Sequence, residues 1–418
     1  MASASVIIAI VAMALSIGLS QARTHPTDIE ALRELKEAID PSSIYSTSCL
    51  GSWDFSSDPC DALSSTVFVC GFQCTIAADQ TLRITSISLD GSGYTGPLSP
   101  YVGNVSSLQL LDISNNAFYG SIPDSISRLV LLSQLDLSRN SFTGSIPTSI
   151  GQLSSLQLLS VSNNLLEGAI PASINSLVSL ERLYVFNNRL SGNIPAMDKL
   201  DQLRFFDASN NLLSGSVSAS LPPSLMQLSL RGNRLQGSLP DDLISLQELE
   251  VMDLSSNSFC DAVYGALFQL PSLQQLNLSN NKLTAITIPE AVDGGSSQLV
   301  AVDISYNRIR GQLPLFLVEM KRLSALSLRH NFLSGAIPIE YGLKAVASLI
   351  GAQPLMRLYL DGNYLMGEIP APFLTIIPGG IAASFVDNCL LSCPLTLPFC
   401  QGGSQKSHSQ CKDFNSVP

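Results

Sequence analysis

Side chains that could serve as general acids, bases or nucleophiles are few and scattered in this chain of 418 residues. The three histidines, His25, His330 and His408, are far apart in the sequence. There is no Gly-x-Ser-x-Gly nucleophile elbow, no phosphate-binding loop and no His-Glu-x-x-His metal motif. The acidic residues recur at regular intervals and are not paired as in a general acid–base site. The sequence therefore predicts a protein that is not an enzyme and needs no cofactor or metal.

Cysteine chemistry is the exception, because eight of the nine cysteines lie in two groups at the ends of the chain. The first group is Cys49, Cys60, Cys70 and Cys74, and the second is Cys389, Cys393, Cys400 and Cys411. Two even groups indicate two disulfide-linked caps, each with three possible pairings. Zinc binding by Cys70-x-x-x-Cys74 is less favoured, since no histidine is nearby. We interpret the remaining Cys260 as a half-buried apolar side chain with an inert thiol.

The beginning of the sequence indicates the compartment in which those disulfides form. Residues 6–19 are almost wholly apolar, and Ser20-Gln21-Ala22 supplies the small residues of a cleavage site. We predict a signal peptide over residues 1–22, with an uncleaved anchor as the alternative. The apolar stretch 373–386 is interrupted by proline and glycine, so no transmembrane segment is expected. The protein should be secreted into the extracellular space or cell wall, where a partner could also hold it at the plasma membrane.

Charge restricts the class of partner. The chain carries 22 Lys and Arg against 33 Asp and Glu, for a net charge of −11. An acidic protein is repelled by phosphate backbones and by anionic membrane surfaces, so nucleic acid is not an expected partner. A basic protein or peptide would be attracted.

One asparagine recurs along most of the chain and marks an internal repeat. It occurs at Asn116, Asn140, Asn164, Asn188, Asn211, Asn233, Asn257, Asn281, Asn307, Asn331 and Asn363. Ser92 holds the same position in a degenerate first copy, which brings the count to about twelve. The surrounding pattern is L-x-x-L-x-L-x-x-N-x-L-x-G-x-I-P, and its first nine positions are called places one to nine below.

The pattern predicts the fold of each repeat. Apolar side chains at places four and six point to the same side of a short strand, and the residue between them points away. The asparagine at place nine can satisfy backbone groups where the chain turns, and the later glycine and proline shape the exit. A single unit buries little, but stacked units pair their strands and share an aliphatic core. We therefore predict a repeat solenoid with a parallel sheet.

Segments such as Gly120-Ser121-Ile122-Pro123 resemble the plant type of extracellular leucine-rich repeat. Trp53 with Asp58-Pro59-Cys60 is similar to the N-terminal cap of that family, and Asp387-Asn388-Cys389-Leu390 resembles its C-terminal cap. The resemblance implies a right-handed superhelix whose concave sheet faces ligands. It divides the chain into a signal peptide (1–22), an N-terminal cysteine-rich cap (23–81), about twelve repeats (82–380), and a C-terminal cap with a polar tail (381–418).

Residues at places three, five, seven and eight should form the exposed inner face, and departures from the consensus there are binding candidates. The first cluster consists of Arg182, Tyr184, Phe186 and Phe205. The second consists of Tyr306, Arg329, His330, Arg357, Tyr359 and Asp361. Arg182 and Phe205 share place three of adjacent repeats and should lie side by side. Exposed aromatic residues with arginine are typical of interface hot spots; the alternative is that they merely pack along the sheet.

Two further features concern the same face. Asp112, Asp136, Asp207, Asp253 and Asp303 all occupy place five. We interpret them as part of the repeat consensus, and the alternative is an electrostatic field that attracts a basic partner. Glycosylation sequons begin at Asn104 and Asn277. A glycan on Asn277 would cover part of the inner face.

Two repeats break the pattern on their outer side. Asp261 and Ala285 stand where glycine is expected, so the outer face should be distorted there. The unit between Asn331 and Asn363 is eight residues longer than the usual 24, since 363 − 331 is 32. Its extra segment, 341–350, has helical character and should loop out on the convex side.

The resemblance to the plant repeat family implies a recognition protein that acts in cell-surface signalling or defence. The expected partner is a protein or peptide, including the ectodomain of a receptor kinase. The alternative is a cell-wall inhibitor of microbial pectin-degrading enzymes, similar to polygalacturonase-inhibiting proteins, whose partner would be a secreted pectinase. A structural cell-wall role is a third reading, although no proline-rich tail is present.

Overall fold

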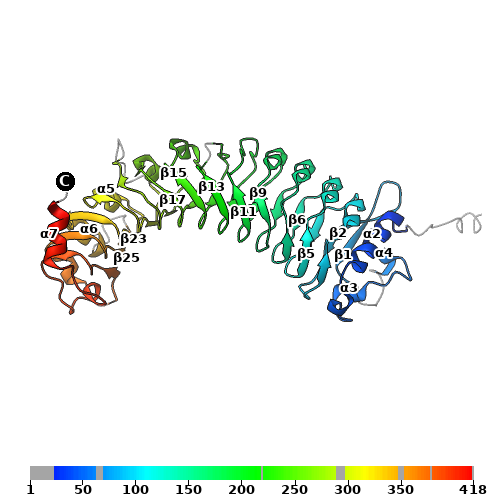
Figure 1. Ribbon diagram of the computed structural model, residues 1–418, viewed down its shortest axis with the longest axis horizontal. Helices are drawn as coiled ribbons and strands as arrows, with labels where there is room; N and C mark the ends of the chain where they lie inside the picture. The colour runs from blue at the N-terminus through cyan, green and yellow to red at the C-terminus, as the bar shows by residue number, and fades with distance from the viewer. Residues whose placement is uncertain are drawn as a thin grey trace, which may run out of the picture. The chain divides into compact units, whose positions relative to one another are not determined.

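The computed structural model describes residues 23–62, 69–217, 220–288, 297–346, 353–376 and 379–416 (Figure 1). The chain forms two compact units, Met1–Phe142 and Thr143–Pro418. The predicted signal peptide lies outside the described residues. Within them, no helix is long and apolar enough to cross a membrane.

Unit 1 begins with a helical cap that leads into the first repeats. The cap contains α2 (Pro26–Glu37), η1 (Pro41–Ser43), α3 (Cys49–Ser52) and α4 (Pro59–Ala62). Strand β1 (Phe72–Ile76) pairs antiparallel with β2 (Leu82–Ser88), and β4 (Leu110–Asp112) and β6 (Gln134–Asp136) follow in parallel. On the other side, β3 (Thr95–Pro97) pairs with β5 (Ala117–Ser121). The connecting 3-10 turns are η2 (Pro100–Asn104) and η3 (Asp124–Arg128).

Two disulfides hold the N-terminal cap together, and an ion pair joins it to the first repeat. Of the three possible cysteine pairings, the structure contains Cys49–Cys70 and Cys60–Cys74. The Asp28 carboxylate is fully buried and accepts two hydrogen bonds of 2.9 Å from the Arg83 guanidinium. A buried charge costs several kcal/mol unless it is paired, so this bidentate pair fixes α2 on β2.

Unit 2 is built on ten parallel strands, which lie beside one another in chain order (Figure 1). They are β8 (Leu158–Ser160), β10 (Arg182–Tyr184), β12 (Phe205–Asp207), β14 (Gln227–Ser229), β16 (Val251–Asp253), β19 (Gln275–Asn277), β21 (Ala301–Asp303), β23 (Ala325–Ser327), β25 (Arg357–Tyr359) and β27 (Ala382–Ser384). Equivalent places face each other in the register, as with Leu183, Phe206 and Leu228. The predicted stack of repeats with an aliphatic core is confirmed, and β27 continues it past residue 380.

Short strands also form on the outer side of unit 2, in separate groups. The first group is β9 (Glu167–Ala169), β11 (Arg189–Gly192), β13 (Leu212–Gly215), β15 (Arg234–Gly237) and β17 (Ser258–Phe259). A separate pair follows, β18 (Ala262–Val263) with β20 (Ala285–Ile286), and then β22 (Arg310–Gly311), β24 (Phe332–Ala336), β26 (Tyr364–Gly367) and β28 (Cys389–Leu390). The interruption after β17 coincides with Asp261, whose φ is +67° in the place of glycine. The predicted distortion is present.

The repeated asparagine forms the ladder that the sequence predicts. The Asn188 amide nitrogen donates to the carbonyl oxygens of Val161, Val185 and Phe186 at 2.9, 3.2 and 3.3 Å. Its amide oxygen accepts from the backbone nitrogen of Leu166 at 3.0 Å. These bonds pair backbone groups that would otherwise be buried and unsatisfied. Asn388 makes the same contacts with Leu360 and Phe385, which carries the ladder into the C-terminal cap.

Short helical segments connect the strands of unit 2. They are η4 (Thr148–Gln152), η5 (Ala172–Ser176), η6 (Asp241–Ser245), η7 (Gly265–Gln269), α5 (Leu315–Glu319), α6 (Ile339–Val346) and η8 (Ala371–Thr375). Helix α6 confirms the helical character of the long repeat up to residue 346, and residues 347–352 lie outside the described part. This helix packs against the preceding repeat. The Tyr341 hydroxyl donates to Pro314 O at 2.9 Å, and buried Lys344 donates to Met320 O at 2.7 Å.

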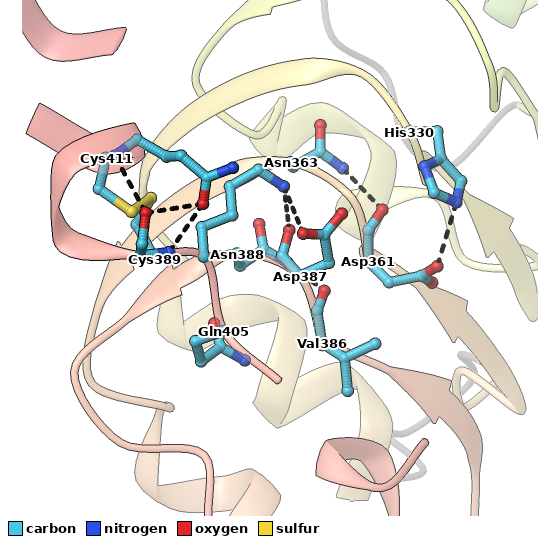
Figure 2. Close-up of polar contacts among 12 residues, drawn as sticks. His330, Asp361, Asn363, Val386, Asp387, Asn388, Cys389, Gln405 and Cys411 are labelled. Atoms are coloured by element: carbon cyan, nitrogen blue, oxygen red, sulfur yellow. Dashed lines mark hydrogen bonds and ion pairs between the residues drawn. A yellow bond between two sulfur atoms is a disulfide. The ribbon is translucent and has the colours of Figure 1, made fainter. Parts of the chain in front are cut away.

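The C-terminal cap closes the end of unit 2. It contains η9 (Pro398–Cys400) and α7 (His408–Ser416), with disulfides Cys389–Cys411 and Cys393–Cys400. Figure 2 shows Cys411 of α7 joined to Cys389 of β28. The Phe414 ring of α7 stacks on Tyr364 with 3.8 Å between centroids. The predicted cysteine-linked caps are therefore present in both units.

Candidate functional site

The exposed face of the ten-stranded sheet displays places three, five, seven and eight of each repeat. In β10 the Leu183 side chain is fully buried, whereas Arg182 is exposed and Tyr184 is half-buried. Because side chains alternate along a strand, the aliphatic core determines which residues point outward but not their types. The types found on this face are therefore free to serve binding.

The first predicted cluster is assembled as the register requires. Arg182 pairs in register with Phe205, and its guanidinium lies 5.6 Å from the centroid of that ring. Tyr184 and Phe186 are half-buried beside them. Burial raises the pKa of the Tyr184 hydroxyl; the Arg182 charge opposes this rise and Asp207 adds to it. The cluster thus combines three aromatic side chains from two adjacent repeats with one cation.

The row of aspartates at place five has a role within the scaffold. One carboxylate oxygen of each aspartate accepts a bond of 2.9 Å from the backbone nitrogen two residues later, as in Asp303 to Ser305. The same bond forms at Asp112, Asp136, Asp207 and Asp253. It closes a turn as the chain leaves the strand. This supports the interpretation of these residues as repeat consensus.

The second predicted cluster contains the densest polar network on this face. The Nε and Nη2 atoms of Arg329 lie 3.1 and 2.9 Å from the same oxygen of Asp361, Oδ2. Nε2 of His330 lies 3.8 Å from that oxygen (Figure 2). The Asp361 side chain is buried, and its Oδ1 atom has no hydrogen-bond partner among the described residues. Burial lowers the pKa of Arg329, but the bonds to Asp361 outweigh this and raise it.

Aromatic rings extend this network along the sheet. The Arg329 guanidinium lies 5.0 Å from the Tyr359 ring centroid, and the Tyr306 ring stacks on His330 with 4.5 Å between centroids. Tyr306 is 46% exposed. Cation–π and ring-stacking contacts of this kind are worth about 0.5–1.5 kcal/mol each. They hold large side chains upright on the surface of the sheet.

The backbone at place eight is left-handed, and Tyr306 and His330 both occupy this place. Five repeats have asparagine there, such as Asn187 with φ of +53°. Tyr306 and His330 adopt the same conformation, with φ of +54° and +52°. For residues other than glycine and asparagine this conformation costs about 1 kcal/mol. Side chains kept at such positions against a cost are candidates for function.

Tyr306 and Arg329 border an open groove on the sheet. Its volume is about 470 Å³, and it extends over β19, β21, β23 and β25. Its lining includes Asn277, Asp303, Tyr306, Arg329, Arg357 and Tyr359. The lining thus combines acidic and amide groups with basic and aromatic side chains. Arg357 is exposed and forms no ion pair among the residues that the structure describes, so its charge is available to a ligand.

The lining of the groove offers a ligand several kinds of contact. Its rings and aliphatic floor offer apolar contact, Asn277 and Asp303 offer polar contact, and Arg357 offers a positive charge. Among the described residues, no group of three or more His, Cys, Asp or Glu side chains could hold a metal ion. A segment of polypeptide, with mixed polar and apolar side chains, is the ligand class that suits such a lining.

Both sequon asparagines are described, and their glycosylation stays a prediction. Asn277 lines the groove, and its Oδ1 accepts from the backbone nitrogen and hydroxyl of Ser279 at 3.1 and 2.8 Å. Asn104 is half-buried, and its Oδ1 accepts from Arg128 at 3.4 Å. A glycan on Asn277 would fill part of the groove.

The sequence predicted the basic and aromatic residues of the groove but not the groove as a whole. It grouped Tyr306, Arg329, Arg357 and Tyr359 together, and the structure brings these four to one groove. It treated Asn277 and Asp303 separately, although both line the same space. The signal that could have joined them is the shared register of places three and five across β19 to β25.

The stacked strands, the asparagine ladder and the capped ends define a repeat protein with a ligand-accessible sheet. A family model described as a leucine-rich repeat region matches residues 63–342. This match covers more than half of the chain, and the chain belongs to that family.

Curated relatives are plant receptor-like proteins. Receptor-like protein 7 of Arabidopsis thaliana is 33% identical over 149 residues, which cover 36% of this chain and 14% of that protein. Receptor-like protein 35 of the same plant is 36% identical over 155 residues, with 36% and 16% covered. The chain therefore spans less than a fifth of the length of these two relatives.

Solved structures of plant receptors share the fold. The peptide hormone receptor RGFR1, in complex with RGF2, is 27% identical with a TM-score of 0.68, covering 77% of this chain and 51% of that chain. The Arabidopsis receptor kinase HAESA, in complex with the peptide hormone IDA and the co-receptor SERK1, is 25% identical with a TM-score of 0.64. That match covers 91% of this chain and 65% of that chain. The resemblance to plant extracellular leucine-rich repeats is thus confirmed.

Proposed function

We propose that this chain is an extracellular recognition protein that binds a peptide or an extended protein segment in the groove over β19, β21, β23 and β25. The observation that carries the proposal is the combination of Arg357, an exposed cation without an ion-pair partner in the described chain, with Tyr306 and Tyr359 in the lining of the same groove. Exposed aromatic residues and arginine dominate binding energies at protein interfaces.

Electrostatics supports a bound segment of mixed charge. An acidic group of the ligand would lie near Arg357, and a basic or amide group would lie near Asp303. The left-handed Tyr306 and His330 add support, because their backbone cost has no return within the scaffold other than their mutual stacking. The two receptor neighbours are solved with peptide hormones, which supports the same ligand class here.

We further propose that the bound chain acts in cell-surface signalling, by presenting its ligand to a receptor kinase ectodomain. One neighbour is solved with both a peptide hormone and a co-receptor. The first cluster, Arg182, Tyr184, Phe186 and Phe205, is proposed as a second contact surface, because its rings and cation are already assembled in the free chain.

The test is affinity capture from the extracellular fluid of the producing tissue, with bound peptides and proteins identified by mass spectrometry. Three double variants are compared with the wild type: Arg357→Ala with Tyr359→Ala in the groove, Tyr184→Ala with Phe186→Ala in the first cluster, and Gln109→Ala with Gln134→Ala, both exposed and outside the two sites, as the control. Thermal melts verify that all of them fold.

We expect a peptide or protein that is retained by the control and lost, at least tenfold, from the groove variant. Its dissociation constant is then measured on the purified components. Equal recovery from the groove variant and the control would disprove the groove assignment. Recovery of a pectin-degrading enzyme as the groove-dependent partner would replace signalling by inhibition as the function.

A further inference from the structure

A second recess lies on the outer side of unit 2, between η6 and η7, and shares no residue with the groove. Its volume is about 340 Å³. Its lining is mostly apolar and includes Leu239, Leu243, Ile244, Tyr264 and Ala266, with Asp241 at its border. The side chains of Ile244 and Tyr264 are 45% and 43% exposed. Because they lie at the surface, they could be replaced without disturbing the core.

In two other pairs of turns, η2 with η3 and η4 with η5, a serine of the second turn bonds the first turn. The Ser173 hydroxyl of η5 donates to the carbonyl oxygen of Thr148 in η4 at 2.6 Å. In unit 1 the Ser125 hydroxyl of η3 donates to Pro100 O of η2, also at 2.6 Å. Both serines are the second residue of their turn, and in η7 that residue is Ala266, which has no hydroxyl.

The fourth residue of the preceding turn adds a second difference. In η4 it is Gly151, where a Cβ atom would collide with Ser173 of η5, so the absence of a side chain permits close approach. Gly103 of η2 has the same relation to Ser125. In η6 this residue is Ile244, whose branched side chain holds η7 away. The turns η6 and η7 accordingly pack less closely than η4 and η5.

A third departure places an aromatic ring at the opening. The residue that precedes η3, η4, η5, η6 and η8 is proline in every case, and before η7 it is Tyr264. The η6–η7 pair thus differs from the pairs η2–η3 and η4–η5 at three positions, and each difference enlarges or lines the same recess. No requirement of the repeat stack explains them.

The surroundings are acidic over a long stretch of chain. Residues 235–281 contain no Lys, Arg or His. They contain six carboxylates, at Asp241, Asp242, Glu248, Glu250, Asp253 and Asp261. Glu248 pairs with Arg204 at 3.7 Å, whereas Asp241 and Asp242, at the start of η6, form no ion pair among the described residues. Their uncompensated charge favours a cation beside the apolar recess.

We propose that this recess is a docking site for a basic protein segment, which inserts one aromatic or aliphatic side chain between η6 and η7 and places Lys or Arg beside Asp241 and Asp242. An apolar anchor in a pocket with charged residues at its rim is the usual arrangement of an interface hot spot. The site does not depend on the groove, so a partner could engage both surfaces of the chain.

The test uses three short, end-capped peptides, Gly-Lys-Phe-Lys-Gly, Gly-Lys-Ala-Lys-Gly and Gly-Glu-Phe-Glu-Gly, titrated against the full chain by saturation-transfer NMR. We expect the Lys-Phe-Lys peptide to bind at least tenfold more tightly than the other two. The variant with Ile244→Gly and Ala266→Ser restores the regular turn residues and should reduce this affinity at least tenfold. Asp241→Asn with Asp242→Asn should reduce it and remove its salt dependence.

Equal binding of the three peptides, no binding, or unchanged affinity in the Ile244→Gly, Ala266→Ser variant would each overturn the proposal. Analytical ultracentrifugation of the wild type and this variant tests whether a second copy of the chain occupies the recess. A dimer formed only by the wild type would show that a second copy of the chain fills the recess, and would likewise overturn it. Thermal melts, together with retained binding of any groove ligand, verify that the variants fold.

Discussion

Arg329 reaches across adjacent strands to Asp361 and directs two nitrogens at a single carboxylate oxygen. The other oxygen is buried and has no hydrogen-bond partner in the described part of the chain. The orientation of a carboxylate in such a position is set by its ion-pair partner and not by water. The pair therefore fixes the Arg329 side chain in the lining of the groove, where it also contacts the Tyr359 ring.

Replacing this carboxylate should destabilise unit 2. Asp361→Asn removes the charge that Arg329 faces, and we expect the free energy of unfolding to fall by about 1–2 kcal/mol, the range for a bond to a charged group that is partly screened. Urea denaturation followed by circular dichroism measures the change. Asp303→Asn is the matched control, since its amide oxygen can still accept from Ser305. Equal effects of the two substitutions would contradict the special role of Asp361.

Place eight offers a test of backbone cost against ring stacking. Arg139 has φ of +54° and is exposed, so Arg139→Asn should stabilise the chain by about 1 kcal/mol. Tyr306→Asn relieves the same backbone cost but also removes the stack on His330, worth about 0.5–1.5 kcal/mol. Its net effect should therefore be close to zero or destabilising. Thermal unfolding of both variants provides the comparison, and an equal gain from both would show that the stack contributes nothing.

Asp90 in unit 1 predicts a pH dependence of stability. Burial alone would raise the pKa of this carboxyl, but hydrogen bonds from Ser92 and Tyr94 at 2.6 and 2.5 Å outweigh it and lower the pKa below 3.8. A lowered folded-state pKa contributes stability that is present above pH 3.8 and is lost as the pH falls through the folded-state pKa.

The Asp90→Asn variant should lose about 1–2 kcal/mol of unfolding free energy near pH 6 and less near pH 3. Urea denaturation at both pH values checks this, with Asp201→Asn, an exposed carboxyl of unit 2, as the control. A loss that is the same at both pH values would mean that Asp90 acts through packing and not through its charge.

The stack itself could be predicted from the sequence because it rests on local periodicity. The spacing of Asn140, Asn164 and Asn188 sets a repeat length, and the alternation around Leu183 sets which side chains are buried. Register follows from these two facts, so the neighbourhood of Arg182 and Phe205 was predictable and is confirmed. Each of these properties depends on one repeat and its copy.

What only the tertiary structure decided depends on side-chain conformations and on small displacements between neighbouring turns. The sequence left the cysteine pairing open, and folding of the caps selects Cys49–Cys70 and Cys389–Cys411 by distance. The single-oxygen contact of Arg329 with Asp361, and the gap between Ile244 and Ala266, arise from how adjacent repeats settle against each other. Periodicity specifies where a residue stands, whereas contact geometry between residues determines what it can bind.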